Sequence, residues 1–105
     1  MDSGVSFSET GRILIAKLSG EIDHHLAKGQ REAIDSMLFC KKPELLVLDF
    51  SGVRFMDSSG IALIIGRYDV AEGVGSKMQI SGLSETLKKL VRLSGVEKLK
   101  NLRID

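Results

Sequence analysis

Two adjacent serines before a long apolar run are the residues of this sequence best placed for chemistry. The segment Asp57-Ser58-Ser59-Gly60 follows a strand-like stretch and precedes a predicted helix. Free amide hydrogens and the positive end of the helix dipole meet at such a point, which favours a phosphate there. Phosphorylation would add about −1.5 to −2 charges and three strong acceptors. The segment is therefore a candidate switch, although a plain helix cap of aspartate and serine has the same composition.

An enzyme alternative is a hydrolase in which Ser58 attacks and His24 or His25 acts as the base. The chain lacks the G-x-S-x-G elbow that exposes such a nucleophile, and it has no evident oxyanion loop. The histidines are adjacent, so on a helix they project about 100° apart and cannot readily share a task or a metal. We expect no enzyme activity and a histidine pair at the surface of a first helical turn.

Metal, nucleotide and nucleic-acid sites have no support in the sequence. No group of Cys, His, Asp and Glu has metal-ligand spacing, and both nucleotide-binding glycine motifs are missing. Fifteen basic and 14 acidic residues give a net charge of +1, without the basic stripe that a broad grip on nucleic acid requires. We expect no cofactor, no metal and no direct contact with nucleic acid.

The length and composition indicate one domain over residues 1–105, with 43% hydrophobic and 28% charged residues. The features that follow lead us to expect it in the cytoplasm. The single cysteine, Cys40, excludes an intramolecular disulfide, and its place at the end of a helical pattern predicts a small, partly buried side chain. Residues 1–4 carry no signal-peptide pattern, and no apolar run is long enough to span a bilayer.

Two short strands and a helix are predicted in the first part of the chain. Alternation predicts strands over residues 4–8 and 13–18, which are separated by a turn and together suggest a hairpin. Ser19 and Gly20 are expected to close the second strand. From Asp23, which can cap a helix, apolar residues recur at spacings of three and four until Pro43 stops the pattern.

Strands and helices alternate in the rest of the chain. Residues 45–50 form a nearly continuous apolar run, typical of a central strand, and Ser51-Gly52 is expected to be a turn. Residues 61–68 are apolar almost all round and predict a largely buried helix. A strand over residues 77–81, a helix capped by Ser84 and ended by Gly95, and a weak strand over residues 99–104 complete the pattern. The fold class is therefore α/β, a mixed sheet with helices packed against it, in the order ββαβαβαβ.

Four segments in this order resemble the STAS domain, specifically the sporulation-type anti-sigma factor antagonist. They are residues 20–25 (GEIDHH), 47–50 (VLDF), 55–60 (FMDSSG) and 65–68 (IGRY). The resemblance extends from about Val5 to Leu102. Two departures are visible: Ala62 stands where these antagonists commonly carry a second glycine, and the sequence stops at Asp105 where the family commonly continues into one more helix.

The resemblance implies a docking partner and a switch. It implies that the unphosphorylated protein binds an anti-sigma factor that is also a serine kinase, thereby freeing a sporulation sigma factor. Phosphorylation of Ser58 by that kinase would end the docking, and a serine phosphatase would reset it. The implied partner-binding residues are Asp23, His24, Asp57, Ser59, Gly60, Ile61 and Arg67.

Three alternatives stay open beside this interpretation. The first is a STAS module of a general stress sigma factor pathway. The second is a small domain that binds nucleotide or has weak catalytic activity, and the third is an accessory domain of a transporter assembly. We expect the free chain to be a monomer without a membrane partner.

Overall fold

The computed structural model describes residues 4–105. In chain order its elements are β1 (Val5–Thr10), β2 (Ile13–Ile22), α1 (His24–Lys41), β3 (Leu45–Met56), α2 (Ser58–Gly73), β4 (Lys77–Ser81), α3 (Glu85–Ser94), the 3₁₀ turn η1 (Val96–Lys98) and β5 (Leu102–Ile104). The predicted order ββαβαβαβ is confirmed. The N-terminal segment without a signal-peptide pattern includes residues 1–3, which lie outside the described residues.

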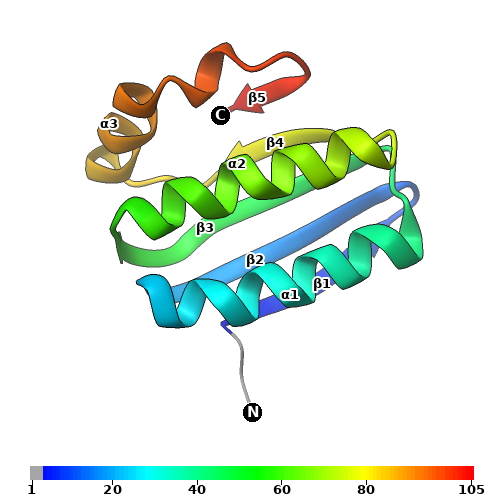
Figure 1. Cartoon of the computed structure of the whole chain (residues 1–105), viewed down its shortest axis with the longest axis horizontal. Helices are drawn as coiled ribbons and strands as arrows, with labels where there is room; N and C mark the ends of the chain where they lie inside the picture. The colour runs from blue at the N-terminus through cyan, green and yellow to red at the C-terminus, as the bar shows by residue number, and fades with distance from the viewer. Residues whose placement is uncertain (1–3) are drawn as a thin grey trace.

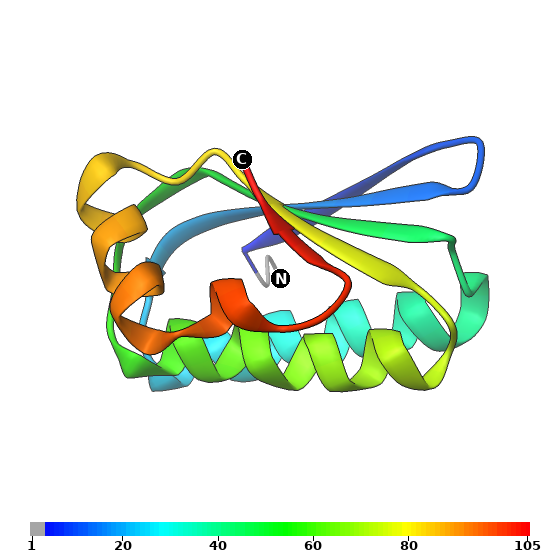
Figure 2. The ribbon, with the colours of Figure 1, turned by 90° about the horizontal axis from the view of Figure 1, so that it is seen from above.

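The strands form one mixed sheet in the spatial order β1-β2-β3-β4-β5. β1 pairs antiparallel with β2, which confirms the predicted hairpin, and β2 to β5 are parallel to their neighbours. A parallel pair needs a long crossover, and each of the three crossovers here contains a helix. Figure 1 shows α1 and α2 side by side and running the same way, and Figure 2 shows both on one face of the sheet.

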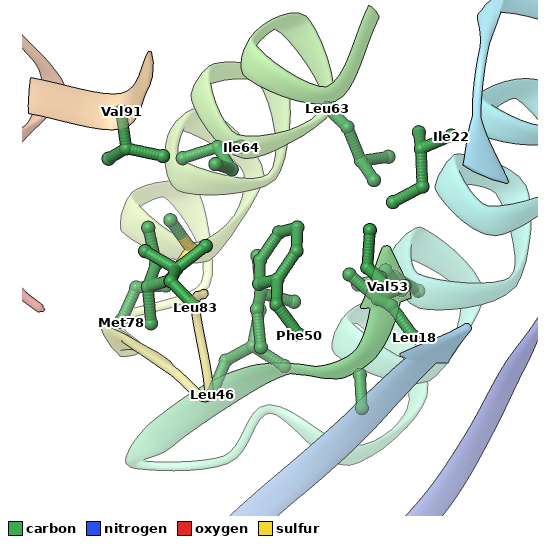
Figure 3. Close-up of a cluster of buried hydrophobic side chains, with 14 of the residues drawn as sticks. Leu18, Ile22, Leu46, Phe50, Val53, Leu63, Ile64, Met78, Leu83 and Val91 are labelled. Carbon is green, nitrogen blue, oxygen red and sulfur yellow. The ribbon is translucent and has the colours of Figure 1, made fainter. Parts of the chain in front are cut away.

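The core fills the layer between the sheet and these helices. Every second residue of the central strands points into this layer, because side chains alternate across a strand. These residues include Leu14, Ala16 and Leu18 of β2 and Leu46, Leu48 and Phe50 of β3. Figure 3 shows Phe50 pointing toward Leu63 and Ile64 of α2. Burial of each large apolar side chain contributes about 1.5–3 kcal/mol, so this layer fixes α2 on the sheet.

Both central strands are longer than predicted. β2 continues through Ser19 and Gly20, where we expected it to end. β3 likewise continues through Ser51 and Gly52, where we expected a turn. The pairing of the two strands shifts register on both sides of Ser19 and Gly20, and an added Cβ at Gly52 would lie 2.9 Å from the carbonyl oxygen of Leu18. Serine and glycine therefore mark irregular pairing inside long strands here, and the predicted breaks are wrong.

Two predictions about burial on the helices are also wrong. α2 begins at Ser58, at the helix start expected for the two serines, but one of its sides is uncovered, since Ile65 is 41% exposed. Cys40 is exposed, although we expected it to be partly buried. It follows the buried Leu38 by two residues and therefore lies about 200° round α1 from it.

The predicted ends of α3 are confirmed. The side chain of Ser84 accepts a hydrogen bond from the amide of Leu87 at 3.2 Å. Gly95 follows the helix with φ +81°, a left-handed conformation that glycine adopts without steric cost. Over residues 4–105, no helix is both long and apolar enough to cross a membrane.

Candidate functional site

The candidate site lies where β2 and β3 end side by side. Ile22 pairs with Met56 at the last position of both strands, and the amide of Asp57 donates to the carbonyl oxygen of Ile22 at 3.2 Å. Each strand is followed by an aspartate and then by a helix. Parallel pairing therefore places the starts of α1 and α2 next to each other, at the carboxyl-terminal ends of β2 and β3 (Figure 1).

Each aspartate caps its own helix. Oδ1 of Asp23 accepts from the amide of Leu26 at 2.8 Å, and Oδ1 of Asp57 accepts from the amide of Ser59 at 2.7 Å. The bond from Leu26 holds the pKa of Asp23 below its ordinary value of 3.8. This cap therefore stabilises the fold above that ordinary pKa, and its contribution is lost as the pH falls through the lowered pKa.

Ser58 is the first residue of α2 and is exposed. Its hydroxyl forms no hydrogen bond with any residue between 4 and 105, so the oxygen is free to react. The side chain lies at the rim of a groove of about 490 Å³ between α2 and α3. This α2–α3 groove is mainly apolar, and its other lining residues are Met56, Asp57, Ile61, Ala62, Ile65, Leu90, Leu93 and Ser94.

Ser59 faces a different groove, between α1 and α2, of about 470 Å³. This α1–α2 groove is lined by His24, Ala27, Lys28, Arg31, Ser59, Ala62, Leu63, Gly66 and Arg67. The two adjacent serines therefore border different grooves. The predicted partner-binding residues Ser59, His24 and Arg67 meet in one groove, and Ser58, Asp57 and Ile61 meet in the other.

Gly60 is buried, whereas Asp57 and Ser58 are exposed and Ser59 is half-buried. A Cβ at this position would come within 2.8 Å of both Cβ and Cγ of Met56, which is itself buried. Glycine is thus needed for the first turn of α2 to rest directly on the end of β3. Contact between Gly60 and a partner stays a prediction. The position faces the interior, which favours a role in packing.

Arg67 is buried at the floor of the α1–α2 groove, with 5% of its side chain exposed. Its Nε lies 2.6 Å from Oδ1 of Asp35 on α1, and this ion pair joins the two helices. Burial lowers the pKa of the guanidinium, the Asp35 carboxylate opposes that shift, and the charge of Arg31 adds to it. The guanidinium keeps its charge at any physiological pH.

The histidines do not form a catalytic arrangement with Ser58. Both are exposed on the first turn of α1, and within the described part of the chain neither donates to or accepts from the serine hydroxyl. Among residues 4–105 no three His, Cys, Asp or Glu side chains gather as metal ligands would.

Three charged residues of α1 escaped the sequence analysis. Lys28 and Arg31 line the α1–α2 groove, and Asp35 pairs with Arg67. Together with His24 they follow spacings of four, three and four, which place them along one face of a helix. That spacing was a usable signal, but it could not reveal that this face borders α2.

These features define the class of the protein: a mixed α/β domain that presents two capped helix starts, one with a free serine hydroxyl, at a single edge of its sheet. The chain belongs to the STAS domain family, whose model matches residues 5–104.

Comparison with known proteins confirms the resemblance to anti-sigma factor antagonists. The chain is 34% identical over 87 residues to the anti-sigma F factor antagonist of Paenibacillus polymyxa, covering 83% of this chain and 74% of that protein. It is similar to the solved structure of the anti-sigma factor antagonist SpoIIAA in its unphosphorylated form, with 28% identity, a TM-score of 0.69 and coverage of 85% and 82%. The Bacillus cell fate determinant SpoIIAA in the phosphorylated form gives 26% identity, a TM-score of 0.73 and coverage of 96% and 90%.

Proposed function

We propose that this chain is an anti-sigma factor antagonist of the sporulation type. Its unphosphorylated form docks on an anti-sigma factor that is also a serine kinase, and docking releases a sporulation sigma factor. The kinase phosphorylates Ser58, which ends the docking, and a serine phosphatase removes the phosphate. The chain is a regulatory protein without enzyme activity of its own, and it acts in the cytoplasm, where sigma factors meet RNA polymerase.

The observation that carries this proposal is the position of Ser58. Its free, exposed hydroxyl stands at the start of a 16-residue helix, where a kinase can reach it without unfolding the domain. The mainly apolar α2–α3 groove begins at the same residue and offers a surface for a partner. The relatives named as anti-sigma factor antagonists, one of them solved in a phosphorylated form, support the same role.

The transfer of a phosphate to Ser58 balances chemically, and the loss of affinity that it causes is large enough to end the docking. Oγ of Ser58 attacks the γ-phosphorus of ATP held by the kinase; the bond to ADP breaks, and the hydroxyl proton passes to a base of the kinase. The phosphoserine then carries about −1.5 to −2 charges beside Asp57. Burying such a group against a partner without counter-charges costs several kcal/mol. About 3 kcal/mol already corresponds to more than a hundredfold in affinity.

Intact-mass analysis tests the phosphorylation. We would incubate the wild type, Ser58→Ala and Ser59→Ala with ATP and the cognate anti-sigma factor kinase. Ser59→Ala is a matched control because it removes the next hydroxyl of the same helical turn. We expect a single added phosphate on the wild type and on Ser59→Ala, and none on Ser58→Ala. A phosphate that persists on Ser58→Ala would move the site elsewhere, and no phosphate on any protein would overturn the kinase–substrate relation.

Binding measurements test the consequence for docking. We expect the phosphorylated protein and Ser58→Asp to bind the anti-sigma factor more weakly, by about a hundredfold for the phosphoprotein. The circular dichroism spectrum of both should match the wild type, because Ser58 is exposed and its hydroxyl forms no hydrogen bond within residues 4–105. The melting temperature should be equal or slightly higher, because a helix start favours negative charge. An unchanged dissociation constant for the phosphoprotein would contradict the switch.

A further inference from the structure

Basic side chains border the α1–α2 groove. His24, Lys28 and Arg31 reach it from α1, and Arg67 forms part of its floor from α2. Among residues 4–105, none of those that line it is acidic. The groove therefore differs in chemistry from the α2–α3 groove on the other side of the same helix, which is mainly apolar.

Small residues leave this groove open. Ala27, Ala62 and Gly66 occupy the positions where larger side chains would close the space between the helices. An added Cβ at Gly66 would meet no atom of residues 4–105 within 4 Å beyond its chain neighbours and the nearby backbone of its own helix, so space remains there. The charged side chains at the rim thus border a depression that an inserted side chain can enter.

The positive charge of the groove is largely uncompensated. Asp35 neutralises Arg67, from which it lies 2.6 Å away. In contrast, Lys28 and Arg31 are exposed and form no ion pair with any carboxylate between residues 4 and 105. The adjacent starts of α1 and α2 lie at the same end of the groove, and the capping carboxylates of Asp23 and Asp57 offset their helix dipoles there.

The form of the positive charge indicates what kind of anion fits. Asp23 and Asp57 already occupy the amides of Leu26 and Ser59, so these amides are not available to cradle a phosphate. Lys28 and Arg31 instead offer separate charges on long, exposed side chains. Such charges suit carboxylates spaced along another protein chain, whose side chains can meet each cation separately.

We propose that the α1–α2 groove receives an acidic segment of the anti-sigma factor, with carboxylates that meet Lys28 and Arg31. This inference rests on the proposed function, because the groove opens beside the helix start that carries Ser58. It also gives the phosphate on Ser58 a second way to weaken docking. A phosphate on Ser58 stands in the same helical turn as Ser59, so it repels a carboxylate that enters the groove as well as resisting burial in the apolar surface.

Charge reversal tests the inference. The double variant Lys28→Glu/Arg31→Glu would be compared with the wild type and with Lys98→Glu/Lys100→Glu, an equal charge change at exposed positions of the η1–β5 segment. Affinity for the cognate anti-sigma factor would be measured at about 50 and about 300 mM NaCl, because salt screens exposed charges. We expect a loss of about tenfold or more for the groove variant, mainly in the association rate, and a weaker salt dependence. The control should bind within about twofold of the wild type.

The outcomes separate the two proposals. If the wild type binds and the groove variant binds equally well, the groove inference is overturned and the proposed function stands. If the wild type does not bind, both are overturned. If ATP alone shifts the amide resonances of Lys28 and Arg31 in the wild type, the groove is a nucleotide site and the assignment to an acidic segment is wrong. Melting temperatures check that all variants fold, and Lys28→Gln/Arg31→Gln should give an intermediate loss of affinity.

Discussion

Gly60 and Gly66 lie on the same helix, but their surroundings need glycine to different degrees. A Cβ at Gly60 would come within 2.8 Å of the buried Met56 side chain, including its Cβ, which cannot move without the backbone. At Gly66 an added Cβ would meet no atom of residues 4–105 within 4 Å apart from its chain neighbours and the nearby backbone of its own helix. The requirement for glycine at residue 60 therefore comes from packing of the helix start on β3.

A matched pair of substitutions tests this difference. Gly66→Ala should raise the free energy of unfolding by about 0.5–1 kcal/mol, because alanine loses less backbone entropy in a helix. Gly60→Ala should lower it by about 1–3 kcal/mol, the usual cost of overpacking. Urea unfolding of both variants measures the two changes. Equal changes of the same sign would mean that contact with Met56 does not decide the role of Gly60.

At the scale of the elements, the sequence predicts the order of strands and helices and the capping residues. Periodicity and caps are local signals, so Asp23, Ser84 and Gly95 were found correctly. The irregular pairing around Ser19 and Gly52 was missed, because a bulge and a turn use the same residue types. The pairing of Arg67 with Asp35 was also missed, since their 32-residue separation is bridged only by the packing of α1 against α2.

The ion pair between Arg67 and Asp35 can be tested at the scale of the elements. Asp35→Ala would leave the buried Arg67 charge without a partner, and we expect it to lower the free energy of unfolding by about 2 kcal/mol, less than for a fully buried pair because 25% of the Asp35 side chain is exposed. Asp35→Ala/Arg67→Met, which removes both charges, should recover most of that loss. Glu44→Ala, which breaks the exposed pair with Arg12, should change stability little. A double variant as unstable as Asp35→Ala would contradict this account.

At the scale of the whole molecule, the centre of the sheet is held by more strand pairing and burial than the C-terminal part. β3 is a 12-residue strand paired on both sides, and its inward-facing side chains form the middle of the core. β5 has three residues and is an edge strand of the sheet that residues 4–105 form, where it pairs with β4. α3 buries Leu87 and Val91 but leaves Leu93 88% exposed. The helix that forms one wall of the α2–α3 groove therefore belongs to the more weakly held part of the fold.

Native-state hydrogen exchange should reveal this difference. We expect the amides of α3, and that of Asp105, which donates to Ile80 at 2.9 Å, to exchange through an opening of lower free energy than the amides of β3. Equal opening free energies for α3 and β3 would instead mean that the domain opens as one unit. A partner bound in the α2–α3 groove contacts α3 only while it is packed, so binding should slow exchange in α3 more than in β3. A phosphate on Ser58 weakens docking by charge at the other wall of the groove, so it should remove this protection without changing exchange in the free protein.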